Sequence, residues 1–470
     1  MIHHFALPIV LGAVLVSQNH LAAEETHYEA DVCVYGGTAS GVMASLAADK
    51  EGAKVILIEP SRWLGGMTGG GINHLDWGKG NTVGGSTYKI LMEGVTEQEQ
   101  KHHGGHAILG IGNKAYRERF KKVVEDRGIT VIYEHRLGTV QVGDATIDAP
   151  TRQRPIALGE DIAPKGKAPS IRSITLDYAP FDKTGCPIPE PKKRNAITVS
   201  AKVFIDCSYE GDVLGMSGAS YTWGREAREH YDESLAGVRP NLWVHDIDPY
   251  IEPANPESGL LPFVQDRKIG PLGSADELTM GYCFRYEFDM SGKGIPIPEP
   301  TNYDPAEFEV YRRAIRDGVD IFSNRKMGKT LGKITTNKRG PFVGGGQLNR
   351  NLMASTVHGC NDDYPNGDWA TRSQIWKFHQ EFLINSFHFA KTDPSAPKSM
   401  KERAEKVTFK KGVFDETGGW PHQLYIRQAR RMVSSYVVTQ KDLEGRTDPP
   451  HTVGLAAYGV DDFPYTAIAQ

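Results

Sequence analysis

Glycines that follow a short apolar run carry the strongest chemical signal in this chain. The run Asp31–Tyr35 is followed by Gly36 and Gly37, and Gly41 completes the sequence G-G-T-A-S-G. A loop of this kind between a buried strand and a helix presents backbone amides that bind phosphate. Thr38 stands where the pattern G-x-G-x-x-G has its second glycine. Gly37 supplies the missing backbone freedom, and the Thr38 hydroxyl is a further hydrogen-bond donor.

An acidic residue ends the next apolar run. Glu59 closes the run Val55–Ile58, at about the 20-residue spacing at which dinucleotide-binding folds place a ribose-binding acid. Its carboxylate accepts hydrogen bonds from ribose hydroxyls at that position. Loop, helix and acid together predict a dinucleotide site, and the alternative is a tight strand–helix turn that binds nothing.

Two glycine clusters follow Glu59 in the sequence L-G-G-M-T-G-G-G at 64–71. They leave little side chain in the way, so the loop can lie along a flat, extended ligand. A flavin dinucleotide requires such a path more than a nicotinamide dinucleotide does, because its ring reaches deep into a protein. The alternative is a surface loop.

Three arginines near the end of the chain are candidates for binding an anion or stabilising a negative charge. In Y-I-R-Q-A-R-R, the residues Arg427, Arg430 and Arg431 recur at helical spacing, which predicts Arg427 on one helix face with Arg430 or Arg431. Guanidinium groups bind carboxylates and stabilise the charge of a reduced flavin. A solvated basic helix face is the alternative. His422 and Tyr425 are candidates for the same pocket.

Histidines supply the candidate acid–base group. His74 lies just beyond the glycine clusters, where it would face a flavin, although a lone histidine more often packs or caps. His102, His103 and His106 form the run K-H-H-G-G-H-A. Because no fourth ligand is evident, we predict no metal site there.

The elements that position these residues follow from the apolar pattern. Residues 31–37 and 53–59 are typical of buried parallel strands, and the helix predicted between them completes one βαβ unit. Residues from about 139 to 205 alternate in the manner of strands, with a proline-rich loop between them. The last of these runs ends in Asp206, and Asp212 follows; taken alone, a role as loop acids or helix caps is as good an interpretation of both as a functional one.

Length and composition exclude several classes of protein. A chain of 470 residues predicts two or three domains. Lys+Arg 54 against Asp+Glu 58, a net charge of −4, gives no sign of a nucleic-acid surface. The 5 cysteines form no C-x-x-C motif and no evident disulfide framework.

The first residues are typical of a secretory signal. The apolar run Phe5–Val16 is too short to span a bilayer comfortably. Polar residues and the pair Ala22–Ala23 precede an acidic start, which predicts cleavage near Ala23, export to the periplasm or the exterior, and no stable membrane span afterwards. An uncleaved anchor or a misassigned start is the alternative, since no Lys or Arg precedes the run.

Four separated motifs together resemble the FAD-dependent oxidoreductase family of the glutathione-reductase-type fold, whose members are sometimes labelled xanthan lyase. The motifs are V-Y-G-G-T-A-S-G-V-M-A-S-L-A-A, V-I-L-I-E-P-S-R-W-L-G-G-M-T-G-G-G, A-K-V-F-I-D-C-S-Y-E-G-D-V-L and G-G-W-P-H-Q-L-Y-I-R-Q-A-R-R-M-V-S-S-Y-V-V-T. They occur in the family's order, and the resemblance extends over about residues 31–470. The family accepts threonine in the middle of its phosphate loop.

The resemblance implies which residues hold FAD: the pyrophosphate lies at 36–41, the adenosine ribose at Glu59, the flavin path at 65–68, and the adenine side at 206–212. The implied cofactor-binding residues are Gly36, Gly37, Thr38, Ala39, Ser40, Gly41, Glu59, Pro60, Gly65, Gly66, Met67, Thr68 and Asp206. The candidate catalytic residues are His74 and Arg427, and the candidate substrate residues are His422 and Arg430.

The expected fold is α/β, with a Rossmann-like FAD/NAD(P)-binding domain at 28–214 that carries a β-rich insertion at about 139–205. A signal peptide at 1–23 precedes it, a mixed α+β substrate or cap domain follows at 215–420, and 421–470 begins the return to the FAD-binding domain. Family members continue for roughly another hundred residues, the scale of a small domain. The chain is therefore expected to be truncated, with an incomplete flavin-ring pocket.

The implied reaction is hydride transfer from a small organic substrate to FAD. Export argues against cytosolic NAD(P)H as reductant and favours an extracellular small molecule; the electron acceptor is open. One alternative is a truncated nucleotide-binding protein without catalysis. Another is a carbohydrate-processing, lyase-like protein, which needs a paired acid–base constellation that the sequence does not show.

Overall fold

The computed structural model describes most of the chain between residues 26 and 454. The described residues are 26–72, 75–76, 84–92, 108–109, 112–150, 170–239, 247–264, 270–320, 325–326, 357, 359–434, 436–448, 452 and 454.

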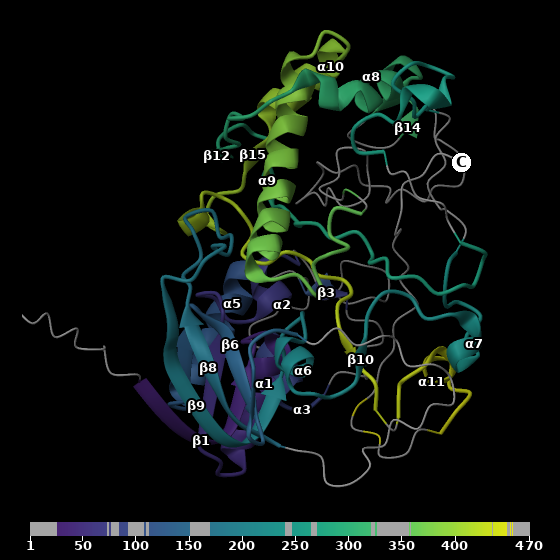
Figure 1. Cartoon of the computed structure of the whole chain (residues 1–470). Coiled ribbons are helices and arrows are strands. Elements are labelled where there is room, and N and C mark those ends of the chain that lie inside the picture. Colours follow the sequence, from purple (N-terminus) through teal and green to yellow (C-terminus); the bar gives the residue numbers. More distant parts are fainter. Residues whose placement is uncertain are drawn as a thin grey trace, which may run out of the picture.

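A seven-stranded sheet forms the lower part of the molecule in Figure 1. In spatial order its strands are β5 (Thr130–Tyr133), β2 (Val55–Glu59), β1 (Thr26–Tyr35), β9 (Lys193–Asp206), β8 (Ile171–Tyr178), β6 (His135–Val142) and β7 (Ala145–Ile147). The pairs β5–β2, β2–β1 and β1–β9 are parallel, and the pairs from β9 to β7 are antiparallel. The predicted parallel βαβ unit is confirmed.

Both faces of the parallel strands are covered, as their uninterrupted apolar sequence requires. On one face, α1 (Ala39–Lys50) and α5 (Gly112–Asp126) pack in a cluster that includes Val34 and Leu57. On the other face, side chains of β6 and β8 pack against β1 and β2 in a second cluster. The alternating runs predicted from about 139 onward are therefore strands of the same sheet, and β9 joins its parallel and antiparallel halves.

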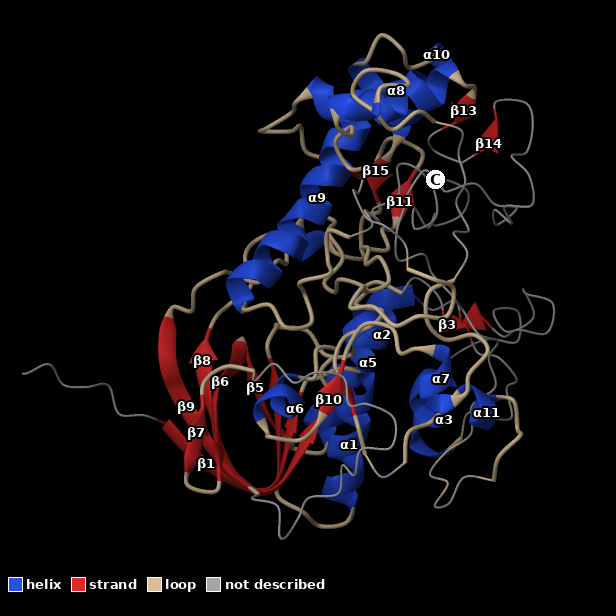
Figure 2. Ribbon diagram, turned by 45° about the vertical axis from the view of Figure 1, so that its right-hand side comes forward, coloured by secondary structure: helices blue, strands red, loops and turns tan. Residues whose placement is uncertain are grey.

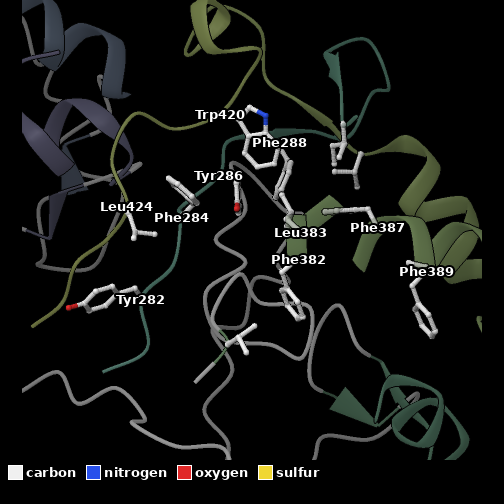
Figure 3. Close-up of a cluster of buried hydrophobic side chains, with 14 of the residues drawn as sticks. Tyr282, Phe284, Tyr286, Phe288, Phe382, Leu383, Phe387, Phe389, Trp420 and Leu424 are labelled. Atoms are coloured by element: carbon white, nitrogen blue, oxygen red, sulfur yellow. The ribbon is translucent and has the colours of Figure 1, made fainter. Parts of the chain in front are cut away.

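A second unit rises from the sheet along α9 (Trp369–Thr392), as Figure 2 shows. It also contains α8 (Glu309–Arg316), α10 (Lys398–Lys406) and a small sheet of β11 (Phe288–Asp289), β15 (Thr408–Phe409) and β12 (Ile295–Pro296). Figure 3 shows its aromatic core, in which residues 282–288 and 420–424 contribute side chains beside those of α9. We call this cluster of buried side chains the aromatic core.

The remaining elements are short. They are α2 (Gly66–Gly70), β3 (Leu75–Asp76), α3 (Gly85–Met92), β4 (Ile108–Leu109), α6 (Asp212–Met216), β10 (Tyr221–Thr222), α7 (Arg228–Tyr231), the 3-10 helices Pro256–Ser258, Pro305–Phe308 and Asp415–Thr417, β13 (Val319–Asp320), β14 (Arg325–Lys326), β16 (Arg431–Met432) and α11 (Gln440–Leu443). Within the described ranges, no helix is long and apolar enough to cross a membrane. All five cysteines are free thiols.

The predicted arginine-bearing helix at 425–431 is wrong. The segment has no helical residues, and it ends in β16, which pairs antiparallel with β10 through Thr222 and Arg431. Tyr425 forms a further bridge with Cys283. Pairing with distant segments overrides the local spacing of the arginines, as tertiary context often does.

Candidate functional site

The phosphate loop lies between β1 and α1, at the carboxyl end of the parallel strands. Gly36 has φ +95°, and a Cβ on it would lie 2.6 Å from the backbone nitrogen of Ser208. Only glycine tolerates both that conformation and that contact with the turn after β9. The glycine therefore lets the loop pack against that turn, and this packing fixes the N-terminus of α1, where amides attract a phosphate.

Thr38 serves the helix rather than the open side of the loop. Its hydroxyl accepts a hydrogen bond from the Gly41 amide at 3.3 Å, as an N-cap, and donates one to the Cys207 carbonyl at 2.8 Å. The side chain is 6% exposed. The expectation that this hydroxyl donates to a ligand is therefore wrong, because its proton is already used. Ser40, which lies 2.9 Å from the Thr38 hydroxyl, is the exposed hydroxyl of the first turn.

Glu59 is fixed beside the loop. One carboxylate oxygen accepts a hydrogen bond from the Gly37 amide at 2.7 Å, and the other accepts one from the Ser61 amide at 2.8 Å. Burial raises the pKa of Glu59 to about 7, against the effect of these hydrogen bonds. Each oxygen has further acceptor capacity, which suits ribose hydroxyls. Pro60 follows in a half-buried turn.

The glycine-rich stretch at 64–71 is hydrogen-bonded to the phosphate loop. The Gly65 amide donates to the Gly37 carbonyl at 2.7 Å. In α2, the Met67 amide donates to the hydroxyl of Tyr209 at 2.8 Å, and a Cβ on Gly66 (φ +49°) would lie 2.4 Å from that hydroxyl. Phosphate loop, Glu59 and α2 thus form one continuous backbone surface, which is the path predicted for a flavin dinucleotide.

Asp206 stabilises the turn that backs this surface. Its carboxylate accepts hydrogen bonds from the amide and hydroxyl of Ser208, at 3.0 and 2.7 Å, and from the Leu214 amide at 2.9 Å. Burial raises its pKa, while these bonds oppose the rise. These contacts stabilise the turn and the first turn of α6, in line with the structural alternative left open by the sequence, and a role near adenine stays a prediction.

Residues 420–427 cover α2 from the side of the aromatic core. The Gln423 amide donates to the Gly70 carbonyl at 3.1 Å. His422, 2% exposed, stacks on Trp63 with ring centroids 3.8 Å apart and meets Phe414 edge-on at 4.8 Å. The predicted substrate residue His422 is therefore enclosed among aromatic rings.

His422 is electrically neutral in this environment. Its Nε2 lies 3.3 Å from a carboxylate oxygen of Glu416, but neither ring nitrogen makes a hydrogen bond to the described part of the chain. Burial, helped by the charges of Arg117 and Arg62, lowers the pKa of His422 to about 2. Desolvation outweighs the nearby carboxylate, whose side chain is 47% exposed.

The structure separates the predicted arginines. The Arg427 guanidinium lies 4.2 Å from the ring centroid of Tyr425, and its Nε donates to the Gly281 carbonyl at 3.1 Å. Arg285, which the sequence analysis did not single out, lies 4.5 Å from the same ring. Arg431 instead pairs with Glu226, with 2.5 Å between Nη2 and Oε1.

Arg430 belongs to a buried ion cluster, so its predicted place in a substrate pocket is wrong. Its Nη1 lies 3.0 Å from Oδ1 of Asp212. Arg372 of α9 binds the same carboxylate in a bidentate manner, at 2.9 and 2.8 Å. Burial opposes the charge of Asp212, but the two guanidinium groups hold its pKa below the usual value. Asp212 is therefore committed to arginine and not to adenine.

Several predicted residues lie outside the described residues. They are His74 and the run His102, His103 and His106; the acid–base role of His74 stays a prediction. Within the described residues, no group of three or more His, Cys, Asp or Glu side chains could hold a metal ion.

Sequence reasoning missed Tyr209, Arg285 and Arg372. For Arg285 a signal exists, since the alternation C-F-R-Y-E-F places Arg285 opposite the aromatic side chains beside it. Arg372 carries no such signal, because its partner Asp212 is far away in sequence.

Comparison with known proteins identifies one family. Residues 31–155 and 188–468 match the family described as FAD dependent oxidoreductase. No curated protein matches the chain.

Solved structures resemble the chain only in part. They include AlpK (10% identity, 47% of this chain and 41% of that chain, TM-score 0.26). Others are THI4 of Thermovibrio ammonificans (16%, 42% and 66%, 0.28) and the OxyS anhydrotetracycline hydroxylase of Streptomyces rimosus (11%, 43% and 38%, 0.25). The chain spans less than two thirds of each of these proteins, and such low TM-scores carry no argument.

Proposed function

The chain belongs to the FAD dependent oxidoreductase family, an enzyme family whose cofactor is FAD, and on this premise we propose that it transfers a hydride from a small organic substrate to FAD. The observation that carries the proposal is the continuous backbone surface formed by the phosphate loop, Glu59 and α2. Tyr209 and Glu59 hold its parts together through the Met67 and Gly37 amides.

The residues present fit FAD. Amides of the first turn of α1 would offset the charge of a pyrophosphate, and Ser40 is the exposed residue of that turn. Glu59 retains acceptor capacity for ribose hydroxyls. Bound FAD supplies the ring that accepts the hydride. Residues 421–423 pack against the end of α2 on the side of the aromatic core.

A direct experiment tests cofactor binding. The purified full chain is expected to absorb at about 450 nm, as flavins generally do. Gly36→Val is expected to abolish FAD uptake, because a side chain there would collide with the Ser208 backbone at 2.6 Å. Gly84→Val is the matched control, since a Cβ on Gly84 would meet nothing within 4 Å. A colourless wild-type protein that takes up no added FAD would overturn the proposal.

A second experiment tests hydride transfer. Under anaerobic conditions, alcohols, amines and sugars are screened for loss of the 450 nm absorbance, and deuterium at the oxidised carbon is expected to slow that loss. Cleavage of a sugar without reduction of the flavin would instead favour the lyase-like alternative.

In the cofactor-binding experiment, full flavin occupancy in Gly36→Val would show that the phosphate loop is misassigned.

We also propose that the protein is exported. The apolar run Phe5–Val16 and the small residues Ala22–Ala23 support this proposal. The measurement is the mature N-terminus by mass spectrometry after expression in a host that secretes. Cleavage near Ala23 is expected, and an intact N-terminus on cytoplasmic protein contradicts export.

A further inference from the structure

We propose that FAD binding by this chain is coupled to the release of a proton from Glu59, so that the protein binds FAD more tightly at neutral pH than in mild acid. The inference rests on the proposed function, because it takes FAD as the ligand of the phosphate loop. It gives Glu59 a regulatory role in addition to its predicted contact with the ribose.

Glu59 ends an interior strand of the large sheet. Strand β2 lies between β1 and β5, and Glu59 is paired in register with Tyr133 of β5. The residue is only 8% exposed, and a Cβ on Gly37 would lie 2.9 Å from one of its carboxylate oxygens. A carboxylate in such a place loses most of its hydration, which disfavours the charged form.

The hydrogen-bond donors of Glu59 are neutral. Its two carboxylate oxygens accept one hydrogen bond each from the buried backbone amides of Gly37 and Ser61. Arg62, the cation nearest to Glu59 in sequence, lies instead 3.4 Å from a carboxylate oxygen of Glu134. The charge that acts most strongly on Glu59 is that of Glu210, another carboxylate, which opposes ionisation. These surroundings stabilise the carboxylate less than an ion pair would.

Titratable groups face Glu59 from the neighbouring elements. Tyr133 of β5, and Tyr209 and Glu210 of the turn after β9, interact electrostatically with it. Burial raises the pKa of Tyr133 to about 12 and the pKa of Tyr209 well above its usual value, so both phenols stay neutral. Burial also raises the pKa of Glu59 to about 7. In the absence of a ligand, the carboxyl group is therefore divided between its two forms near neutral pH.

The ribose of FAD would distinguish these two forms. Ribose hydroxyls donate hydrogen bonds to the acid at this position of a dinucleotide site. Because the Gly37 and Ser61 amides already use one acceptor position on each oxygen, a proton on the neutral acid takes one of the positions that remain for the ribose. Hydrogen bonds to a charged acceptor are also about twice as strong as those to a neutral one. FAD therefore prefers the carboxylate, and its binding expels the proton.

Affinity for FAD then depends on pH in one direction. Bound FAD lowers the pKa of Glu59 from the value of about 7 that burial sets. The affinity is therefore fully present above that pH, and it decreases by up to about tenfold per pH unit as the pH falls, until the complex also takes up a proton. Since one charge-assisted hydrogen bond corresponds to about tenfold in affinity, we expect FAD to bind about tenfold more weakly at about pH 5.5 than at about pH 8.

Calorimetry on the FAD-free full chain measures proton release directly. FAD, which has no group that titrates near neutral pH, is added at about pH 7 in buffers that differ in their enthalpy of ionisation. The difference in heat is expected to correspond to about half a proton released per FAD. Glu59→Gln cannot ionise, so it should release no proton and bind FAD with the same affinity at both pH values. Its affinity at about pH 8 should be about tenfold below that of wild type.

Glu210→Gln is the matched control, because Glu210 is the neighbouring carboxyl group and burial also raises its pKa. This variant should still release a proton and keep the pH dependence. The 16 histidines of the chain titrate in the same range, so a pH dependence that survives in Glu59→Gln would overturn the inference. Absence of proton release in wild type, or its loss in Glu210→Gln alone, would do the same.

A pair of smaller ligands replaces Glu59→Gln if that variant loses the wild-type circular dichroism spectrum. Adenosine is expected to release a proton from the wild-type chain, and dideoxyadenosine, which lacks both ribose hydroxyls, is expected to release none. Equal release by the two ligands would contradict the role of Glu59. A wild-type chain that takes up no FAD at any pH would overturn the proposed function and this inference together, whereas FAD uptake without proton release overturns the inference alone.

Discussion

At the scale of the residue, Thr38 shows how a departure from a motif is accommodated. The motif has glycine there, yet the side chain fits because its hydroxyl both caps α1 and donates to the Cys207 carbonyl. Threonine thus stabilises the loop through the turn after β9, and its hydroxyl is not directed at a bound phosphate.

We therefore expect Thr38→Gly, which restores the motif, to destabilise the protein. An N-cap hydroxyl contributes about 1 kcal/mol, although glycine recovers part of it, and the bond to the Cys207 carbonyl is lost as well. Urea denaturation gives the free energy of unfolding, and Thr38→Ser, which keeps the hydroxyl, is the control. A Thr38→Gly protein as stable as wild type would show that the two hydrogen bonds are unimportant.

His422 gives the molecule a pH dependence of known sign. Its pKa is lowered to about 2 by burial and by Arg117 and Arg62, from 6.5 for the free side chain. Between these values the unfolded chain binds a proton that the folded protein does not. The free energy of unfolding is therefore not reduced by His422 above pH 6.5. It decreases as the pH falls from 6.5 towards 2, by up to about 1.4 kcal/mol per pH unit.

His422→Phe, which preserves an aromatic ring against Trp63, is expected to lose stability less steeply than wild type between pH 6.5 and 4.5. Urea denaturation at several pH values measures the difference in slope. Parallel curves for the two proteins would mean that His422 titrates normally in the folded state.

At the scale of the element, α2 is a helix of only five residues that carries part of the predicted cofactor surface. Such a short helix has little stability of its own. It is held by the hydroxyl of Tyr209 at the Met67 amide and by the Gly70 carbonyl, which accepts from the Gln423 amide.

Tyr209→Phe should therefore loosen α2 while leaving the sheet intact. The Met67 amide loses its partner, and an unsatisfied buried donor costs about 1–3 kcal/mol. We expect weaker FAD binding, measured by fluorescence titration, together with lower stability. Tyr88→Phe, at a 45% exposed side chain, is the control. Unchanged FAD affinity in Tyr209→Phe would place the flavin path away from α2.

At the scale of the whole molecule, the ion cluster at Asp212 joins three distant parts of the chain. Asp212 begins α6, Arg372 lies in the first turn of α9, and Arg430 lies just before β16. Arg372 is 2% exposed. Burial penalises each of these charges, so the cluster persists only while all its partners are in place.

Asp212→Asn is expected to cost about 3–5 kcal/mol, because two arginines remain buried beside a neutral amide. The double variant Asp212→Asn/Arg372→Met should lose less than the sum of the two single losses, since paired charges are then removed together. Urea unfolding measures all three variants. The exposed pair Lys122–Asp126 supplies the control, where Asp126→Asn should cost under about 1 kcal/mol. Additive losses would contradict the cluster.

The sequence by itself determined the strand–loop–helix–strand unit and the glycine surface that follows it. These features are local: the apolar runs of β1 and β2, the small residues of the loop and Glu59 lie within one short stretch. The pattern of apolar runs, small loop residues and a closing acid is therefore complete within one stretch of the sequence, so residue type and spacing suffice to predict the unit.

Only the tertiary structure decided what the arginines do. Spacing alone placed Arg427 and Arg430 on one helix, whereas strand pairing with residues 221–222 and the bridge to Cys283 extend the segment. Arg430 then meets Asp212, and Arg427 meets Tyr425 and Arg285. Asp212 and Arg285 are more than a hundred residues away from these arginines, and contacts at such separation depend on packing between distant segments, which no local pattern of residues encodes.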